Sequence, residues 1–169
     1  KQEDFDKLQE FMMGPHFHWF FRYRYYADLL INDRDKDENI LDQFQFTHTF
    51  YDKAAPQSPY MKHLNFLLDL LQPVAIFKIT GNLLTRLPNI VQHPFHTDMA
   101  FLSEEKLKQW TTSIFYVNTN NGYTIFEDGT KVESVANRLL TFPANMKHTG
   151  TSCTDEKVRI VINFNYYTR

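Results

Sequence analysis

The second half of the chain contains a series of short β-type segments, and this series most constrains the fold. Between Val74 and Tyr167 the segments read VAIFKIT, LLTRL, TTSIFYVN, GYTIFEDG, RLLTFP and KVRIVINFNYY, with Gly, Pro and Asn between them. β-branched and aromatic residues favour strands, whereas Gly, Pro and Asn interrupt them. Many short strands of this kind predict a double-sheet jelly roll or a partly open barrel over residues 74–167.

The last segment, residues 158–167, predicts two different faces for its strand, because alternate residues of a strand point to opposite sides. One face is apolar and consists of Val158, Ile160, Ile162, Phe164 and Tyr166. The other is mainly polar and consists of Arg159, Val161, Asn163 and Asn165. The apolar face needs a cover, which N-terminal helices would supply. Buried polar groups need partners, so the polar face inside the sandwich predicts a binding site.

The first part of the chain, residues 1–73, mixes helical and irregular patterns. The apolar stretch Leu64–Leu71 ends before Pro73 and predicts a short helix. A second helical piece is expected at Ser103–Gln109, with Ser103 as a favourable N-cap. With 169 residues the chain is expected to form one domain. The predicted fold is mostly β with N-terminal helices: a double-stranded β-helix (jelly roll) with the helices packed on the larger sheet.

Composition narrows the classes of partner and compartment. The formal net charge of -2 gives no electrostatic footprint for nucleic acid. The one cysteine, Cys153, excludes an internal disulfide and fits a reducing compartment such as the cytoplasm. No apolar run approaches the roughly 20 residues that a membrane helix needs. Neither a nucleic acid nor a membrane is therefore expected as a partner.

His96 and Asp98 form an H-x-D pair around Thr97. At the end of a strand, positions i and i+2 project to the same side, so an imidazole and a carboxylate there can bind one metal ion. His148 follows the RLLTFP strand and a short turn, and it is the natural third ligand. Two histidines and one carboxylate form the face that holds Fe(II) in non-haem oxygenases, with coordination positions left open.

Arg159 adds a second feature, because an H-x-D pair by itself is not specific. It lies eleven residues after His148, at the start of a strand with a polar inner face. A buried arginine is costly unless a carboxylate meets it. A dicarboxylate that chelates the metal at one end would place its far carboxylate against this guanidinium.

Together these residues form a pattern that resembles the metal- and co-substrate-binding motifs of the superfamily of 2-oxoglutarate- and Fe(II)-dependent oxygenases. Two segments between the predicted metal-binding strands, Tyr116–Asn118 and Gly122–Phe126, are similar to the Y-L-N and G-G-x-T-x-F segments of its prolyl-hydroxylase-like branch. The phrase YVNTNNGYTIFEDG, flanked by FHTD and HTGTSCTD, is most similar to uncharacterised bacteriophage-encoded oxygenases. The resemblance covers about residues 74–167.

The resemblance implies that His96, Asp98 and His148 bind Fe(II) and that Arg159 pairs with the distal carboxylate of 2-oxoglutarate. It implies O2 as the second co-substrate, with ascorbate as an optional addition. The implied reaction couples oxidative decarboxylation of 2-oxoglutarate, to succinate and CO2, with hydroxylation of a protein or peptide side chain such as proline. For a phage-encoded protein, the implied location is the host cytoplasm.

Further co-substrate contacts are implied less directly. Tyr116 lies on the strand that often contributes a hydroxyl to the same carboxylate. Some prolyl hydroxylases have a co-substrate-binding tyrosine ten residues before the first histidine ligand, and this chain has Arg86 there. Arg86 would bind a substrate or co-substrate carboxylate, unless the register of the loop differs. Asn82, near the same strand, is the alternative polar contact.

Several other candidates favour ordinary roles. His93 is read as a surface histidine of a loop, and His16–His18 as part of an aromatic packing or substrate-facing wall. Asp33–Asp37 imitates the start of a calcium loop but lacks its glycine and its final glutamate. Cys153 has no activating base in its sequence neighbourhood. Two rival functions stay open: a catalytically silent jelly-roll binding module, and a cupin-like metal enzyme that does not use 2-oxoglutarate.

Overall fold

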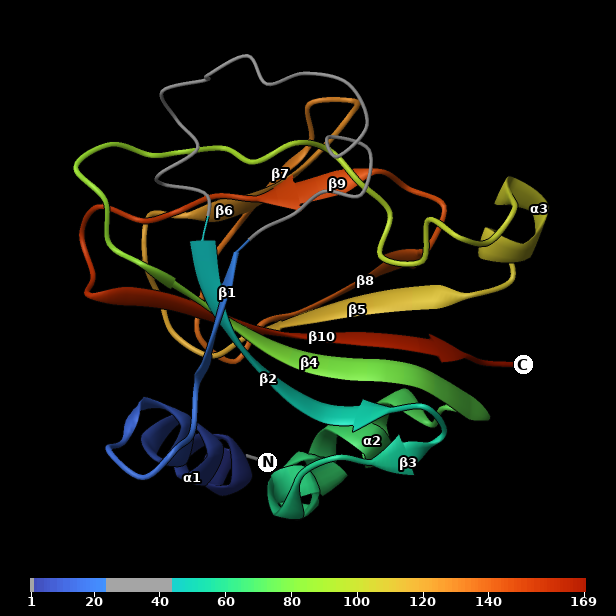
Figure 1. The fold of residues 1–169 in the computed structure, drawn as a ribbon, viewed down its shortest axis with the longest axis horizontal. Helices are drawn as coiled ribbons and strands as arrows, with labels where there is room; N and C mark the ends of the chain where they lie inside the picture. The colour runs from blue at the N-terminus through green and yellow to red at the C-terminus, as the bar shows by residue number, and fades with distance from the viewer. Residues whose placement is uncertain (1, 24–43) are drawn as a thin grey trace.

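Two antiparallel sheets face each other in the computed structural model, which describes residues 2–23 and 44–169. The large sheet has the strand order β1-β2-β4-β10-β5-β8, and β3 pairs with β2 at its margin. The small sheet has the order β7-β6-β9 and lies above the large sheet (Figure 1). The strands of the large sheet are β1 (Phe20–Tyr23), β2 (Phe44–Asp52), β3 (Ala55–Pro56), β4 (Ala75–Thr85), β5 (Thr111–Tyr116), β8 (Leu139–Pro143) and β10 (Val158–Tyr167). Those of the small sheet are β6 (Tyr123–Phe126), β7 (Lys131–Glu133) and β9 (His148–Gly150). This arrangement is a jelly roll, as the sequence predicted.

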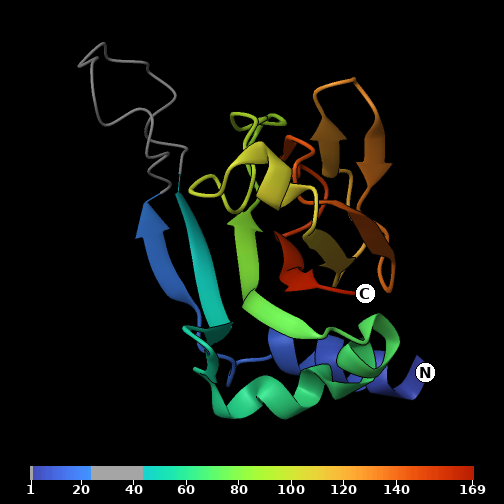
Figure 2. The ribbon, with the colours of Figure 1, turned by 90° about the vertical axis from the view of Figure 1, so that its right-hand side faces the viewer.

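Helices cover the outer face of the large sheet, opposite the small sheet (Figures 1 and 2). They are α1 (Gln2–Met13), the 3-10 helix η3 (Pro59–Leu64) and α2 (Asn65–Leu71). α1 buries Phe5, Leu8 and Met12, a helical spacing that places all three on one face. They join a core cluster that contains the apolar residues of β10. The predicted packing of N-terminal helices on the larger sheet is therefore confirmed.

Two predicted helices are present, with small differences in extent. In the apolar stretch 64–71, Leu64 is the last residue of η3 and the remaining residues form α2. α2 ends where Gln72 takes a left-handed conformation (φ 45°). α3 (Glu104–Leu107) occupies the second predicted position but is shorter than expected. Ser103 precedes it in an extended conformation without a capping hydrogen bond from its side chain. No helix in the described ranges is both long enough and apolar enough to cross a bilayer.

The expectation that residues 1–73 are only helical or irregular was wrong. β1, β2 and β3 all belong to this part and extend the large sheet. β2 reads FQFTHTFYD, in which aromatic residues and threonines alternate with the period of a strand. The aromatic run before it also contributes to packing, since Phe17 is buried against Trp19 and His48. The Asp33–Asp37 run lies outside the described residues.

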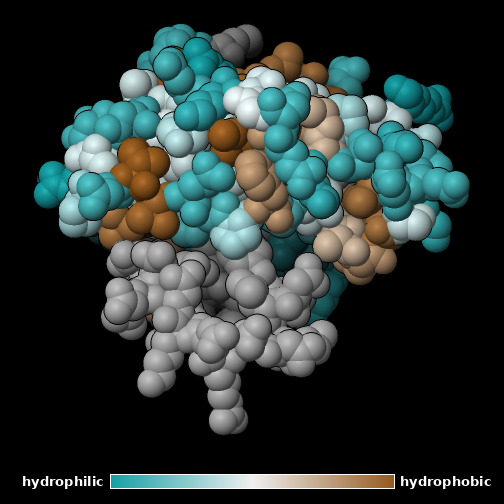
Figure 3. Space-filling view, turned by 90° about the horizontal axis from the view of Figure 1, so that it is seen from above, coloured by the Kyte–Doolittle hydropathy of each residue, from teal (hydrophilic) through white to brown (hydrophobic). Residues whose placement is uncertain are grey.

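The inner face of the large sheet is polar over most of its width. On β10 the alternation is as predicted: Ile160, Ile162 and Phe164 join the core under the helices. Arg159, Val161, Asn163 and Asn165 line a cavity between the sheets. β4 follows the same rule, with Lys78, Thr80, Asn82 and Leu84 on the cavity side. From above, the face over the small sheet is mainly hydrophilic, with hydrophobic residues in separate small groups (Figure 3).

Candidate metal centre

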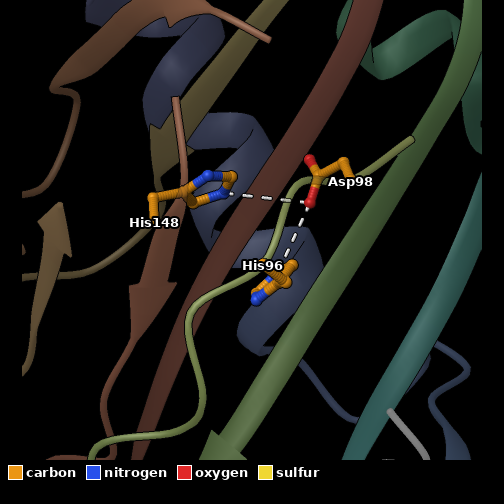
Figure 4. Close-up of side chains that lie close together, drawn as sticks. All are labelled: His96, Asp98 and His148. Carbon is orange, nitrogen blue, oxygen red and sulfur yellow. Dashed lines mark ion pairs between the residues drawn. The ribbon is translucent and has the colours of Figure 1, made fainter. Parts of the chain in front are cut away.

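Three side chains from two distant segments converge above the polar face of the large sheet. His96 and Asp98 come from the segment between β4 and α3, and His148 begins β9. The three side chains point toward one another (Figure 4), and one ligand atom from each lies within 4.8 Å of the others. Asp98 Oδ1 lies 3.5 Å from His96 Nε2 and 3.8 Å from His148 Nε2.

The backbone sets the relative positions of the two histidines. His96 and His148 form an isolated antiparallel bridge, in which each amide donates to the other carbonyl at 3.0 Å. The bridge continues the pairing of the small sheet, because His148 also pairs with Phe126 of β6. The His148 ring packs edge-on against Phe142, with ring centroids 4.8 Å apart. The segment that carries His96 is therefore fixed against a strand of the small sheet.

Each imidazole is oriented by a carbonyl two residues before it in the chain. His96 Nδ1 lies 3.2 Å from the Pro94 carbonyl oxygen, and His148 Nδ1 lies 3.2 Å from that of Met146. A carbonyl only accepts, so a hydrogen bond there requires the proton on Nδ1. Nε2 of each ring is then left facing Asp98, where it can donate to the carboxylate or, once deprotonated, offer its lone pair to a metal ion.

The charges of the cluster also suit a cation. Burial by itself raises the pKa of Asp98, but the hydrogen bond from His96 and the charges of His148 and His96 outweigh it. The resulting pKa of Asp98 lies well below its ordinary value, so the carboxylate stays ionised. Burial lowers the pKa of His148 and favours the neutral imidazole, although Asp98 opposes this effect. Asn163 Nδ2 lies 3.5 Å from the other carboxylate oxygen, Asp98 Oδ2.

A cavity of about 450 Å³ lies beside the cluster and reaches from Arg159 to the β1 side of the sheet. His96, Asp98 and His148 line one part of it, and Arg159 and Gly150 line another. Its walls in the described part of the chain are mainly polar. They are the side chains of Arg22, Gln45, Thr47, Thr49, Lys78, Thr80, Asn82, Thr124, Asn163 and Asn165, with Leu84, Ile114 and Val161 as apolar members.

Arg159 is buried, with 3% of its surface exposed, and two hydroxyl groups orient it. Its Nε donates to Ser134 Oγ at 2.8 Å and its Nη2 donates to Thr124 Oγ1 at 3.3 Å. Tyr116 donates its own hydroxyl to the same Thr124 oxygen at 2.7 Å. Burial raises the pKa of Tyr116, so its hydroxyl stays protonated and keeps its hydrogen bond to Thr124. Arg159 and Tyr116 are thus linked through Thr124.

Two glycines make room for the Arg159 side chain. A Cβ at Gly122 would lie 2.7 Å from Arg159 Cδ, and a Cβ at Gly150 would lie 3.1 Å from Arg159 Nη1. Both distances are shorter than ordinary van der Waals contacts of a carbon atom. Sequence reasoning did not find this role, nor that of Ser134. The only signal for the glycines was their position in the GYTIF and HTG segments, close to the strand ends.

The remaining sequence candidates fall in different places. Asn82 lines the cavity, in register with Val161 on β10, and its amide lies 3.4 Å from the Thr80 carbonyl oxygen. Arg86 is exposed and lines a separate small pocket with Leu87, Pro88 and Thr154, so this geometry does not place it with Arg159.

Of the residues for which the sequence favoured ordinary roles, one differs from expectation in its burial. His93, expected at the surface, is 3% exposed and therefore buried. Its backbone amide donates to Gly150 O at 3.4 Å, so His93 lies on the segment that runs beside β9. His16 is exposed. Cys153 is buried, its thiol lies 3.4 Å from the Glu156 carbonyl oxygen, and burial raises its pKa, which disfavours a reactive thiolate.

No protein-family model and no curated protein matches the chain. Among solved structures, a 2OG-Fe(II) oxygenase family oxidoreductase from Burkholderia pseudomallei is similar, with a TM-score of 0.52 and 13% identity. The similarity covers 73% of this chain and 66% of that one. The non-haem α-ketoglutarate-dependent epimerase SnoN from nogalamycin biosynthesis has a TM-score of 0.55 and 15% identity, covering 72% of this chain and 60% of that one. At such identities the similarity shows a shared fold.

A cupin from Desulfovibrio desulfuricans overlaps more weakly, with a TM-score of 0.44 and 12% identity over 84% of this chain and 95% of that one. This chain spans about two thirds or less of the Burkholderia protein and of SnoN.

Proposed function

We propose that this chain is a non-haem Fe(II) dioxygenase that couples oxidative decarboxylation of 2-oxoglutarate, to succinate and CO2, with hydroxylation of a second substrate. One observation carries the proposal: a single cavity is lined by a two-histidine, one-carboxylate cluster and, farther along, by a buried arginine. The fold shared with a 2OG-Fe(II) oxygenase family protein and with a non-haem α-ketoglutarate-dependent epimerase is consistent with it.

The cluster fits Fe(II) by the chemistry of its donors. Two neutral imidazole nitrogens and one carboxylate oxygen form the facial set that leaves coordination positions open for other ligands. Both Nε2 atoms are directed at Asp98 by the carbonyl partners of their Nδ1 atoms. Bound Fe(II) would supply the activation of O2, which no side chain of the cavity can perform. The residues of the chain hold the ion, orient the co-substrate and limit access of water.

The interval along β10 leaves room for the long Arg159 side chain and a short dicarboxylate together. Arg159 and Asn163 lie on the same face four residues apart, which is roughly 13 Å along a strand. Asn163 lies beside Asp98, so the metal cluster stands over one end of this interval and Arg159 at the other. The guanidinium would bind the distal carboxylate with two parallel hydrogen bonds. Tyr116 and Thr124 are close enough to Arg159 to contribute hydroxyl groups to the same end.

Arg159 favours this function over the two rivals. A cupin-like enzyme that does not use 2-oxoglutarate has no need for a buried guanidinium in the cavity. A silent binding module has no need for three converging ligands in which both Nε2 atoms face one carboxylate. Arg159 and His148 are buried, and their burial is costly unless they meet a ligand or other polar groups.

The finer parts of the proposal depend on the sequence motifs alone. These are the prolyl-hydroxylase-like branch, a bacteriophage source, a protein or peptide substrate such as a prolyl side chain, the optional use of ascorbate, and a cytoplasmic location.

The test is the formation of succinate from 2-oxoglutarate by the purified chain with Fe(II) and O2, with and without candidate peptides. We expect iron-dependent succinate formation that is lost in His148→Ala and that needs more 2-oxoglutarate in Arg159→Lys. A metal-dependent reaction that proceeds equally well without 2-oxoglutarate would favour the cupin-like alternative. If wild type binds neither Fe(II) nor 2-oxoglutarate, the result would favour the silent module.

A further inference from the structure

The cavity is larger than the region between the metal cluster and Arg159. Beyond β10 its floor continues across β4, β2 and β1, through Lys78 and Thr80, then Thr47 and Thr49, to Arg22. Neighbouring strands lie about 4.8 Å apart, so β2 is roughly 10 Å and β1 roughly 14 Å from β10. This extension lies to one side of the line that joins Asp98 to Arg159, where the co-substrate would bind.

The charge carried by the described residues that line the extension is positive. Of the described residues that line the cavity, Arg22, Lys78 and Arg159 carry positive charge, and Asp98 is the only acidic residue. Arg159 and Asp98 already have roles at the co-substrate and metal ends. The half-buried Lys78 makes no ion pair with the part of the chain that the structure describes. Among the described residues that line the cavity, positive charges outnumber negative ones, and such a lining favours an anionic ligand.

Two buried polar atoms beside Lys78 lack a partner within the described residues. They are Thr80 Oγ1 and Asn163 Oδ1, and they belong to residues that pair directly across β4 and β10. Both residues line the cavity. Buried polar atoms are nearly always hydrogen-bonded, so two such atoms together in a cavity point to a ligand that supplies the missing bonds. Asn163 also lies next to Asp98, which places these atoms beside the metal cluster.

We infer that this extension binds the primary substrate and that the substrate carries an anionic group, a carboxylate or a phosphate, which pairs with Lys78. Thr80 and Asn163 contact the part of the substrate nearest the metal cluster, with Asn163 Oδ1 accepting a hydrogen bond from it. Thr47 and Thr49 line the floor beyond, and Arg22 supplies a second positive charge at the far end. This inference rests on the proposed function, since it assigns the remaining space of the same cavity to the second substrate.

The experiment measures binding by ligand-observed NMR rather than turnover, on the full chain, with each probe alone. The probes are inorganic phosphate, N-acetyl-glutamate amide, and the uncharged N-acetyl-glutamine amide, which differs from the second probe only in its carboxylate. 2-Oxoglutarate is titrated separately. The variants are Lys78→Gln and Thr80→Val in the extension, and Arg159→Lys at the other end. Lys62→Gln removes an exposed lysine of η3 as a matched control.

We expect at least one of the two anionic probes to bind wild type more tightly than the uncharged amide. The stronger of the two identifies the anion as carboxylate or phosphate. Lys78→Gln should weaken that probe by about tenfold or more, the usual result of losing a charge-assisted hydrogen bond. Thr80→Val, which keeps the shape of the side chain, should weaken it by a smaller factor. Lys62→Gln and Arg159→Lys should leave binding of the anionic probe unchanged. Arg159→Lys should weaken the binding of 2-oxoglutarate instead.

The inference is overturned if neither anion binds better than the uncharged amide, or if Lys78→Gln and Thr80→Val both bind the anion as well as wild type does. It is also overturned if the anion is lost in Arg159→Lys instead, because the probe would then occupy the co-substrate end. Failure of the proposed function has a different signature. In that case 2-oxoglutarate does not bind at the Arg159 end, while the anionic probe still depends on Lys78.

Discussion

His96 and His148 hold each other in place through their backbones, since each donates its amide to the other's carbonyl at 3.0 Å. The two imidazoles are therefore positioned by pairing between the small sheet and the preceding segment, whether or not an ion is bound. Preorganisation of this kind lowers the entropy lost when a metal binds. The arrangement also separates the structural role of these residues, which belongs to the backbone, from the ligand role of their side chains.

Replacing either imidazole should therefore remove the metal site without removing the bridge. We expect His148→Ala and His96→Ala to lose Fe(II) binding, because two remaining protein ligands hold the ion poorly. Asp98→Ala should be milder, since water or a halide can take the vacant position. Anaerobic Fe(II) titration measures the effect, with the exposed His16→Ala as the control. Undiminished Fe(II) binding after loss of either His96 or His148 would refute the assignment.

Arg159→Lys should weaken the binding of 2-oxoglutarate while leaving Fe(II) affinity unchanged. Lysine keeps the positive charge but loses the planar fork that binds a carboxylate at two points. It also loses the donation from Nε to Ser134 that orients the guanidinium. Losing a charge-assisted hydrogen bond costs about 1.5 to 3 kcal/mol, or about ten- to a hundredfold in affinity. Direct titration with 2-oxoglutarate measures this, and equal affinity in the two proteins would mean that Arg159 is structural.

Much of the architecture around β10 was predictable, because its alternation is unambiguous. Isoleucine and phenylalanine occupy every second position, and the residues between them include Arg159 and two asparagines. Such a strand must lie with one face under an apolar cover and the other in a polar interior. The convergence of His96, Asp98 and His148 depended instead on the recognition of a motif, since nothing in strand periodicity brings residues 50 positions apart together.

β2 was missed because its alternation is partly hidden. Its helix-facing residues are Phe46, His48 and Phe50, and the histidine interrupts the apolar series. His48 is accommodated by two hydrogen-bond partners, the His18 carbonyl and the Ser58 hydroxyl, each at 2.7 Å. These partners come from other parts of the chain, so the sequence around β2 does not reveal them. The polar extension of the cavity could not be predicted for the same reason, since β2 supplies part of it.

His48 should make the stability of the protein depend on pH. Burial lowers its pKa from 6.5, although the hydrogen bond with the His18 carbonyl opposes this effect. Between the lowered pKa and 6.5 the unfolded chain binds more protons than the folded one, so stability rises with pH in that window. The free energy of unfolding should thus fall as the pH decreases below about 6.5, by up to about 1.4 kcal/mol for each unit of displacement.

Urea unfolding of wild type and His48→Gln at several pH values between 5 and 8 tests this prediction. The variant loses ring contacts with Phe17 and Phe50, so it should be less stable at every pH. Its pH slope below 6.5 should nevertheless be shallower than that of wild type. Parallel slopes in the two proteins would assign the acid sensitivity to other groups, such as the buried His148.

Gly150→Ala should weaken the binding of 2-oxoglutarate by displacing Arg159. The new Cβ would lie 3.1 Å from Arg159 Nη1 and 3.8 Å from its Cζ, so the guanidinium must shift by a few tenths of an ångström. Gly122→Ala is a more severe change, because its Cβ would also lie 2.8 Å from the backbone oxygen of Ser152. We expect Gly122→Ala to lower stability by about 1 to 3 kcal/mol, as overpacking usually does. Gly150→Ala should fold normally but bind 2-oxoglutarate several-fold more weakly.

A double-mutant cycle distinguishes this effect from a general disturbance of the metal site, since Gly150 lies only two residues after His148. If Gly150 acts by making room for the guanidinium, Gly150→Ala should cost less 2-oxoglutarate affinity in an Arg159→Lys background than in wild type. Lysine is narrower at this position and can avoid the new methyl group. Fe(II) affinity, measured in parallel, should stay unchanged in both backgrounds. Additive losses of 2-oxoglutarate affinity, or a loss of Fe(II) affinity in Gly150→Ala alone, would instead place the effect of Gly150 at His148.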